Sequence, residues 1–308
     1  MIRYRFTTLH STVFLLFTLI VIDTNCVLSW NPANFSFNPG DQYQLVWQDQ
    51  FENVGPSKAI IDGKPAYAPN PKNWGLAVGT KHDGGIENYT NATENAYVQN
   101  NQLTIVAMKE GYTSARLSSK YLQEFTFGVF AAKIRMPYSQ GIWPAWWLTG
   151  DGTNHSVWWP TTGEIDMIEM LGGTKRATFN DQHVISTIHW NNQSNTMNPQ
   201  HNQQIQTFWQ TPDGSKLHDN SLVYWSEWNS TMVTIGVNEF TVFQQNTTLL
   251  PNSINPSWAF SGKWSYEMIL NIAIGGGWAG APDNTTVWPQ KMIVDWVRVY
   301  QKKPTTLF

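Results

Sequence analysis

Short runs in which apolar and polar side chains alternate recur along most of the chain, and no useful window keeps a helical period. Clusters of Gly, Asn and Pro separate these runs, as turns separate strands. The runs that predict strands cover residues 43–47, 96–108, 127–136, 184–190, 231–237, 266–274 and 291–300. Since every strand must cover its apolar side, many strands with little helix predict an all-β sandwich of two packed antiparallel sheets.

Three acids lie close together in the stretch GEIDMIEM: Glu164, Asp166 and Glu169. On a regular strand side chains return to the same face every second residue, so Glu169 would point away from the other two. Alternation breaks once, at the consecutive apolar residues Met167 and Ile168. A β-bulge there would return Glu169 to the face of the other acids and keep the apolar side chains buried.

A bulged strand of this kind places two glutamates on one open face with an aspartate between them. We expect their carboxyl groups to lie about 5 to 5.5 Å apart, the separation that suits a retaining glycosidase. Like charges at short range raise the proton affinity of at least one carboxyl, so one glutamate can act as acid and the other as nucleophile. The alternatives are a solvated polar strand face, which needs no bulge, and a calcium site, which usually recruits carbonyls and turn residues.

Composition limits the classes of protein to which the chain can belong. The chain has 308 residues, of which 41% are hydrophobic and 13% are charged, so it can bury a sizeable core. No repeat, linker or charge block divides it, and we predict one domain over residues 30–308. The net charge of -3 and the lack of a basic tract exclude a nucleic-acid partner. Seventeen Trp residues exceed what one core needs, and surplus indoles often face sugar rings.

The N-terminus predicts export. Arg3 and Arg5 precede an apolar stretch that is too short to span a bilayer, as in a secretory signal over residues 1–29, with cleavage between 26 and 29. The only cysteine, Cys26, lies at this boundary, so the exported chain has no disulfide. We therefore expect an extracellular, monomeric protein without a membrane partner. Glycosylation sequons fit this expectation and stand at Asn34, Asn88, Asn91, Asn154, Asn192, Asn229, Asn246 and Asn284.

The acid motif resembles the signature Glu-x-Asp-x-x-Glu of the laminarinase-like branch of glycoside hydrolase family 16, here preceded by WPTTG at 159–163. Further segments similar to that family are LVWQDQF (45–51), IENYT with AYVQNNQLTIVA (86–107), FGVFAAKIRMPYSQGIWPAWWL (127–148), TIHW (187–190), LNIAIGGGWAG (270–280) and IVDWVRVYQ (293–301). The resemblance implies a β-jelly-roll with a concave cleft, and retaining hydrolysis of internal β-1,3 bonds in glucans, with mixed β-1,3/1,4 chains often accepted.

The resemblance also implies roles. Glu164 would be the nucleophile, Glu169 the general acid and base, and Asp166 the residue that tunes Glu164. The positions that match sugar-binding or cleft residues are Trp143, Trp159, Trp278 and His189, and nearer the glycone side Asn88, Tyr89 and Arg116. His189 could instead hydrogen-bond a strand neighbour. Trp146 and Trp147 are adjacent, so one of them must belong to the core.

No cofactor is implied for the reaction. Family members often carry a structural calcium on the convex side, held by an aspartate that would here be Asp295. Gln50 stands where an acid is common, which speaks against the ion. The polar segment 191–204 reads as a long surface loop beside the cleft. Two other functions remain open: a non-catalytic β-1,3-glucan recognition protein and a glucan transglycosylase.

Overall fold

The computed structural model describes residues 35–79, 84–153, 156–173, 181–191, 202–250 and 257–304. These residues belong to the compact unit Asn31–Phe308. The predicted signal segment and the sequons at Asn34, Asn154 and Asn192 lie outside the described residues. Within the described ranges, no helix is both long and apolar enough to cross a membrane.

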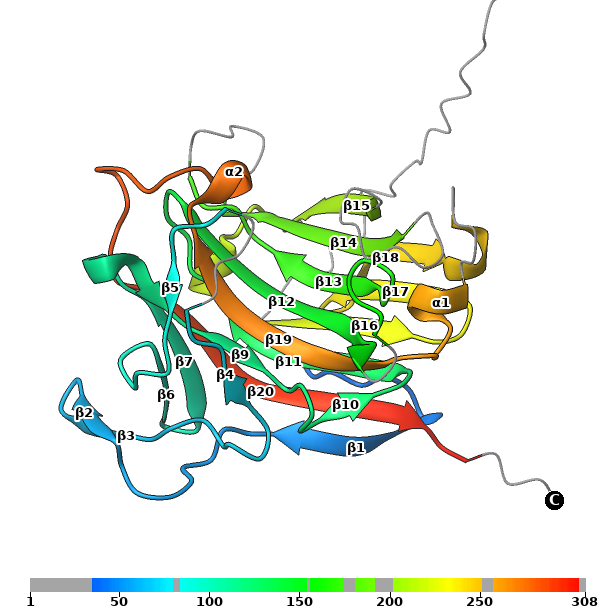
Figure 1. Ribbon diagram of the computed structural model, residues 1–308, viewed down its shortest axis with the longest axis horizontal. Helices are drawn as coiled ribbons and strands as arrows, with labels where there is room; N and C mark the ends of the chain where they lie inside the picture. Colours follow the sequence, from blue (N-terminus) through cyan, green and yellow to red (C-terminus); the bar gives the residue numbers. More distant parts are fainter. Residues whose placement is uncertain are drawn as a thin grey trace, which may run out of the picture. The chain divides into compact units, whose positions relative to one another are not determined.

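Two eight-stranded antiparallel sheets make up most of the described chain (Figure 1). One, the cleft sheet, has the order β15 (Asn202–Gln210), β14 (His183–Asn191), β13 (Glu164–Glu169), β12 (Ile142–Asp151), β19 (Ser265–Ile274), β9 (Arg116–Ser118) and β4 (Gly75–Leu76), with β10 (Glu124–Phe125) also paired to β19. The other, the outer sheet, has the order β18 (Phe240–Asn246), β17 (Met232–Val237), β16 (Leu222–Trp228), β11 (Gly128–Arg135), β20 (Gln290–Lys302), β7 (Gln102–Ala107) and β6 (Ala96–Gln99), with β1 (Tyr43–Asp49) also paired to β20.

The remaining elements are short. A hairpin joins β2 (Ala59–Ile61) and β3 (Lys64–Ala66), and β5 (Asn88–Tyr89) pairs in parallel with β8 (Thr113–Ser114). The helices described are α1 (Ser257–Phe260), α2 (Gly276–Ala279) and three 3₁₀ turns at Glu110–Tyr112, Leu217–Asp219 and Thr247–Leu249.

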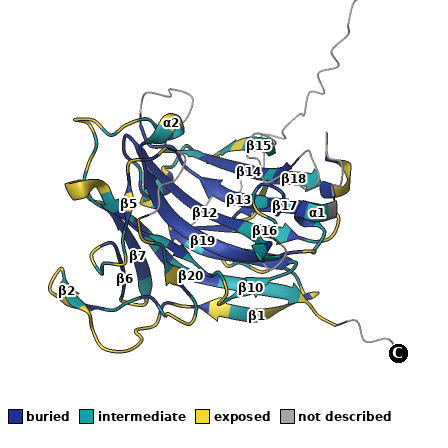
Figure 2. Cartoon of the chain, viewed as in Figure 1, coloured by how far each residue is buried: buried dark blue, intermediate teal, exposed yellow. Residues whose placement is uncertain are grey.

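The core lies between the two sheets, and the strands that Figure 2 shows as buried are those at its centre. Trp146 and Trp190 of the cleft sheet and Tyr224 and Trp228 of the outer sheet are each less than 2% exposed. The rings of Trp228 and Tyr266 lie 4.3 Å apart and join the outer sheet to the cleft sheet. Large buried aromatics contribute much of the apolar area removed from water. The two packed antiparallel sheets confirm the predicted all-β jelly-roll sandwich.

All seven runs predicted from alternation contain strands. The run 96–108 folds as the hairpin β6–β7, and its turn residues Asn100 and Asn101 take the left-handed φ values of 54° and 56° that a two-residue hairpin turn requires. The prediction of a surface loop over residues 191–204 is wrong at both ends. Residue 191 ends β14, residues 202–204 begin β15, and residues 192–201 lie outside the described ranges. β15 is polar because one of its faces lines a cleft. Its polar composition resembles that of a turn, so the sequence did not reveal the strand.

Candidate active site

The acid stretch forms the central strand β13 and contains the predicted bulge. Trp146 and Trp147 of β12 pair with Ile168 and Asp166, so Met167 is the extra residue. The register with β14 shifts over the same span, between Asp166 and Glu169. The carbonyl of Met167 accepts a hydrogen bond from the buried Ser186 hydroxyl at 2.9 Å, which satisfies a group that the disrupted ladder leaves unpaired.

The bulge divides the strand's residues as the pattern predicts. The apolar residues Ile165, Met167, Ile168 and Met170 are fully buried. Glu164 and Glu169 both line one cavity of about 540 Å³. The side chain of Asp166 is 4% exposed and that of Glu164 is 16% exposed. The two glutamates therefore share one open face.

Glycine is required immediately before the first acid. Gly163 has a φ of +83°, and a side chain there would collide with the hydroxyl of Tyr266 and with Ala259. Its carbonyl accepts a bond from the Thr149 hydroxyl at 3.2 Å. This turn after WPTT delivers the chain into β13 with Glu164 facing the cleft.

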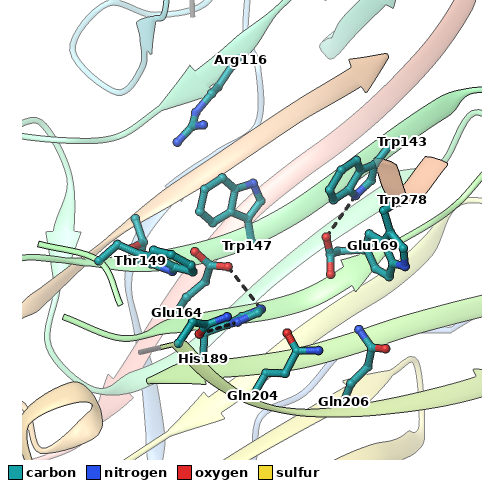
Figure 3. A pocket seen from close by; sticks show the side chains of 12 residues that line it. Arg116, Trp143, Trp147, Thr149, Glu164, Glu169, His189, Gln204, Gln206 and Trp278 are labelled. Carbon is teal, nitrogen blue, oxygen red and sulfur yellow. Dashed lines mark hydrogen bonds and ion pairs between the residues drawn. The ribbon is translucent and has the colours of Figure 1, made fainter. Parts of the chain in front are cut away.

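Antiparallel pairing arranges the cleft face in rows that cross four strands. One row contains Thr149, Glu164, His189 and Gln204. The next contains Trp147, Asp166, Thr187 and Gln206, and the third contains Ala145, Glu169, Ile185 and Phe208. Figure 3 shows the four side chains of the first row, Trp147 and Gln206 of the second row, and Glu169 around the same cavity. The cavity is lined by Arg116, Trp143, Trp147, Thr149, Trp159, Glu164, Glu169, His189, Asn202, Gln204, Gln206 and Trp278.

Glu164 lies in a charged environment. His189 Nε2 is 3.6 Å from Glu164 Oε1 and 3.3 Å from Asp166 Oδ2. Burial, followed by the neighbouring charge of Asp166, raises the pKa of Glu164 well above its ordinary value, while His189 and Arg116 act in the opposite direction. His189 and Arg116 therefore favour the ionised form of Glu164, against burial and the charge of Asp166.

Glu169 lies among aromatic rings. The indole N–H of Trp143 donates a hydrogen bond to Glu169 Oε1 at 3.0 Å. The rings of Trp143 and Trp278 meet edge to face with centroids 5.0 Å apart. Trp143 is 3% exposed, so its main role here is to hold Glu169, and Trp278 is the more accessible ring of the pair.

A second layer fixes the indole of Trp147. Its N–H donates to Asn271 Oδ1 at 2.8 Å, and the Asn271 amide donates to the Tyr89 hydroxyl at 3.1 Å. The guanidinium of Arg116 lies over the same indole, 4.8 Å from the ring centroid. Trp146 is buried in the core, so Trp147 is the member of the pair that reaches the cleft.

Most of the predicted site residues line this cavity, and three do not: Asp166, which lies beside it 3.3 Å from His189, Tyr89 and Asn88. Trp143, Trp159, Trp278, His189 and Arg116 line it with the two glutamates. Tyr89 is fully buried, so the expectation that it contacts sugar is wrong; it supports Trp147 through Asn271. Asn88 is exposed on β5 but is not among the lining residues.

The sequence reasoning missed Trp147, Thr149, Asn202, Gln204 and Gln206 as lining residues. Period-two spacing from Trp143 along β12 could have identified Trp147 and Thr149. No local signal identifies the β15 residues, because their role depends on pairing with β14.

The aspartate expected to hold calcium is already paired with a lysine. Asp295 is 3.3 Å from the ammonium of Lys133 and accepts a bond from the Gln102 amide at 2.6 Å, so a lysine already neutralises the aspartate expected for calcium. Among the described residues, Glu164, Asp166 and His189 form the group of three whose ligand atoms lie within 4.8 Å of one another. An ion there would engage the carboxylate of Glu164, which faces the cleft.

A jelly-roll sheet with two glutamates facing a tryptophan-lined cleft defines the class of β-sandwich glycoside hydrolases, and comparison with known proteins agrees. The profile described as "XgeA-like, catalytic GH16 domain" matches residues 79–242. The Beta-glucanase of Rhodothermus marinus is 30% identical over 84% of this chain and 85% of its own length. The clotting factor G alpha subunit of Tachypleus tridentatus is 33% identical over 94% of this chain, which spans 38% of that protein.

Among solved structures, the catalytic domain of an endo-1,3-beta-glucanase (laminarinase) from Thermotoga petrophila RKU-1 superposes with a TM-score of 0.70 at 30% identity. The match covers 85% of this chain and 99% of that domain. The chain belongs to glycoside hydrolase family 16.

Proposed function

We propose that this protein is a retaining endo-β-1,3-glucanase with Glu164 as nucleophile and Glu169 as general acid and base. The observation that carries the proposal is the bulge at Met167, which brings both glutamates to one face of the cleft. Their surroundings differ, with cationic groups near Glu164 and a neutral indole N–H on Glu169. Different surroundings are what separate the roles of two like carboxyls.

The reaction proceeds in two displacements. A Glu164 oxygen attacks the anomeric carbon and forms a glycosyl ester, while the carboxyl proton of Glu169 passes to the departing glycosidic oxygen. Glu169, now ionised, removes a proton from water, and that water oxygen displaces Glu164 from the anomeric carbon. Both carboxyls return to their starting states, and the anomeric configuration is retained.

The cleft suits a polysaccharide chain. All of its lining residues except Trp159 and Trp278 come from β15, β14, β13, β12 and β9, which span five interstrand steps, or about 24 Å. Indole rings line the cavity and offer flat apolar faces to sugar rings. A glucan that continues past both sides of the catalytic pair is cut internally. The names of the Rhodothermus and Thermotoga relatives, a beta-glucanase and an endo-1,3-beta-glucanase, support β-1,3-glucan as the substrate.

The proposal is tested with laminarin and the variant Glu164→Gln. We expect loss of the nucleophile to reduce the release of reducing ends at least about 10³-fold. Exposed Glu52→Gln serves as the matched control and should retain wild-type rates. Equal rates for wild type and Glu164→Gln would refute the proposal, and binding without any turnover in the wild type would favour a recognition protein.

The site of action is proposed as extracellular. The support is the signal-like segment at residues 1–29 and the sequons of the remaining chain. Expression of the full chain in a secreting host, with N-terminal sequencing of the medium, checks this. A start near residues 27–30 is the expected result, and retention of an intact N-terminus inside the cells would contradict it.

A further inference from the structure

Asn202, the first residue of β15, is joined to the catalytic cluster through His189. Its amide oxygen Oδ1 is 3.1 Å from His189 Nδ1, and Asn202 itself lines the cleft. An amide oxygen only accepts hydrogen bonds, so this contact requires a hydrogen on Nδ1. The other ring nitrogen, Nε2, faces Asp166 Oδ2 at 3.3 Å and Glu164 Oε1 at 3.6 Å.

Two carboxyls within ion-pair distance of Nε2 favour, when ionised, a hydrogen on this nitrogen in addition to the one on Nδ1. We propose that Asn202 is a positioning residue that holds His189 in this doubly protonated form and thereby keeps the nucleophile Glu164 ionised. The inference rests on the proposed function and extends it to a residue outside the acid motif.

The charges around Glu164 show why such a residue is needed. Asp166 and Glu169 on the same strand are acidic, and the Tyr266 hydroxyl on β19 lies nearby, so the cations facing Glu164 are His189 of β14 and Arg116 of β9. The β12 and β15 residues that line the cavity carry no titratable group. Burial raises the pKa of Glu164, so loss of the positive charge on His189 should leave Glu164 protonated over a wider range of acidic pH.

The test compares the pH dependence of kcat/KM on laminarin for Asn202→Leu, which removes the acceptor, and Asn202→Asp, which keeps one. We expect the acidic limb of the kcat/KM profile of Asn202→Leu to move up by about one pH unit. At pH values above that limb its activity should approach the wild-type level. Asn202→Asp should hold the limb at or below its wild-type position. Gln203→Leu is the matched control, because Gln203 follows directly on β15, is not among the cleft-lining residues and should leave the limb unmoved.

A double variant separates positioning from loss of structure. His189→Gln should move the acidic limb in the same direction, and adding Asn202→Leu to it should move the limb no further, since both changes remove one interaction. Additive shifts, or a uniform fall in activity with an unmoved limb, would overturn the inference. The proposed function fails differently, through wild-type protein without glucanase activity or through an active Glu164→Gln variant.

Discussion

The two ends of the acid stretch on β13 present the same side chain in different chemical surroundings. At Glu164 the neighbours are ionic: Asp166, His189 Nε2 at 3.6 Å, and Arg116 beyond Trp147. At Glu169 they are aromatic and neutral, with the Trp143 N–H at 3.0 Å and Trp278 beside it (Figure 3). His189 and Arg116 favour the ionised form of Glu164, against burial and Asp166, which raise its pKa. A neutral setting suits a carboxyl that exchanges a proton in each step.

The acid motif alone does not assign the roles of nucleophile and acid to its two glutamates. Within GEIDMIEM the two glutamates differ only in position, and the neighbours that distinguish them come from β9, β12, β14 and α2. Spacing supplies the pair, and tertiary packing makes its members unequal.

The different roles of Glu164 and Glu169 can be tested with two substrates that carry different leaving groups. Glu169→Gln should lower laminarin hydrolysis by about 10²- to 10⁴-fold, because the sugar leaving group departs without a proton. With a 2,4-dinitrophenyl β-laminaribioside, which needs no protonation to leave, the variant should show a rapid burst of dinitrophenol followed by slow turnover. Glu164→Gln should show neither burst nor turnover. The opposite pattern would mean that the two roles are exchanged.

A smaller effect tests the indole that holds Glu169. Trp143→Phe keeps an aromatic ring but removes the N–H, and we expect kcat on laminarin to fall about tenfold with little change in KM. Trp278→Phe changes the other, more accessible ring of the same aromatic pair and should mainly raise KM. If Trp143→Phe changes KM alone, Trp143 binds sugar and does not position the acid.

The smallest effect concerns stability at the Glu164 end. Because burial raises the pKa of Glu164 in the folded state, the folded protein binds this proton more tightly than the unfolded chain does. Stability therefore falls as the pH rises from the unfolded pKa near about 4.3, and the full cost is present above the folded pKa. Glu164→Gln removes the charge, so its Tm should exceed the wild-type value by about 2 °C at neutral pH.

The same measurement at lower pH gives the internal control. Below about pH 4 both states of the wild type hold the proton, and the difference in Tm should disappear. A Tm gain that persists unchanged at low pH would show that packing of the amide, and not removal of a buried charge, is responsible.

The all-β class and the shared face of the three acids follow from the sequence alone. Period-two alternation is a local consequence of strand geometry, so it revealed seven of the strand runs. The single break at Met167 and Ile168 revealed the bulge, because one extra residue reverses every later side chain. The family resemblance added the order of the roles and most of the cleft tryptophans.

Only the tertiary structure decided which partners those acids meet. The bonds from Trp143 to Glu169 and between Asn202 and His189 join residues that are 26 and 13 positions apart in the chain, and no local pattern encodes either contact. Tyr89 is fully buried and accepts a hydrogen bond from Asn271 of β19, which also bonds Trp147, although its sequence position resembles that of a cleft residue. Alternation tells which face a side chain takes, whereas its neighbours follow from strand order and register, which are set by the packing of the whole sandwich.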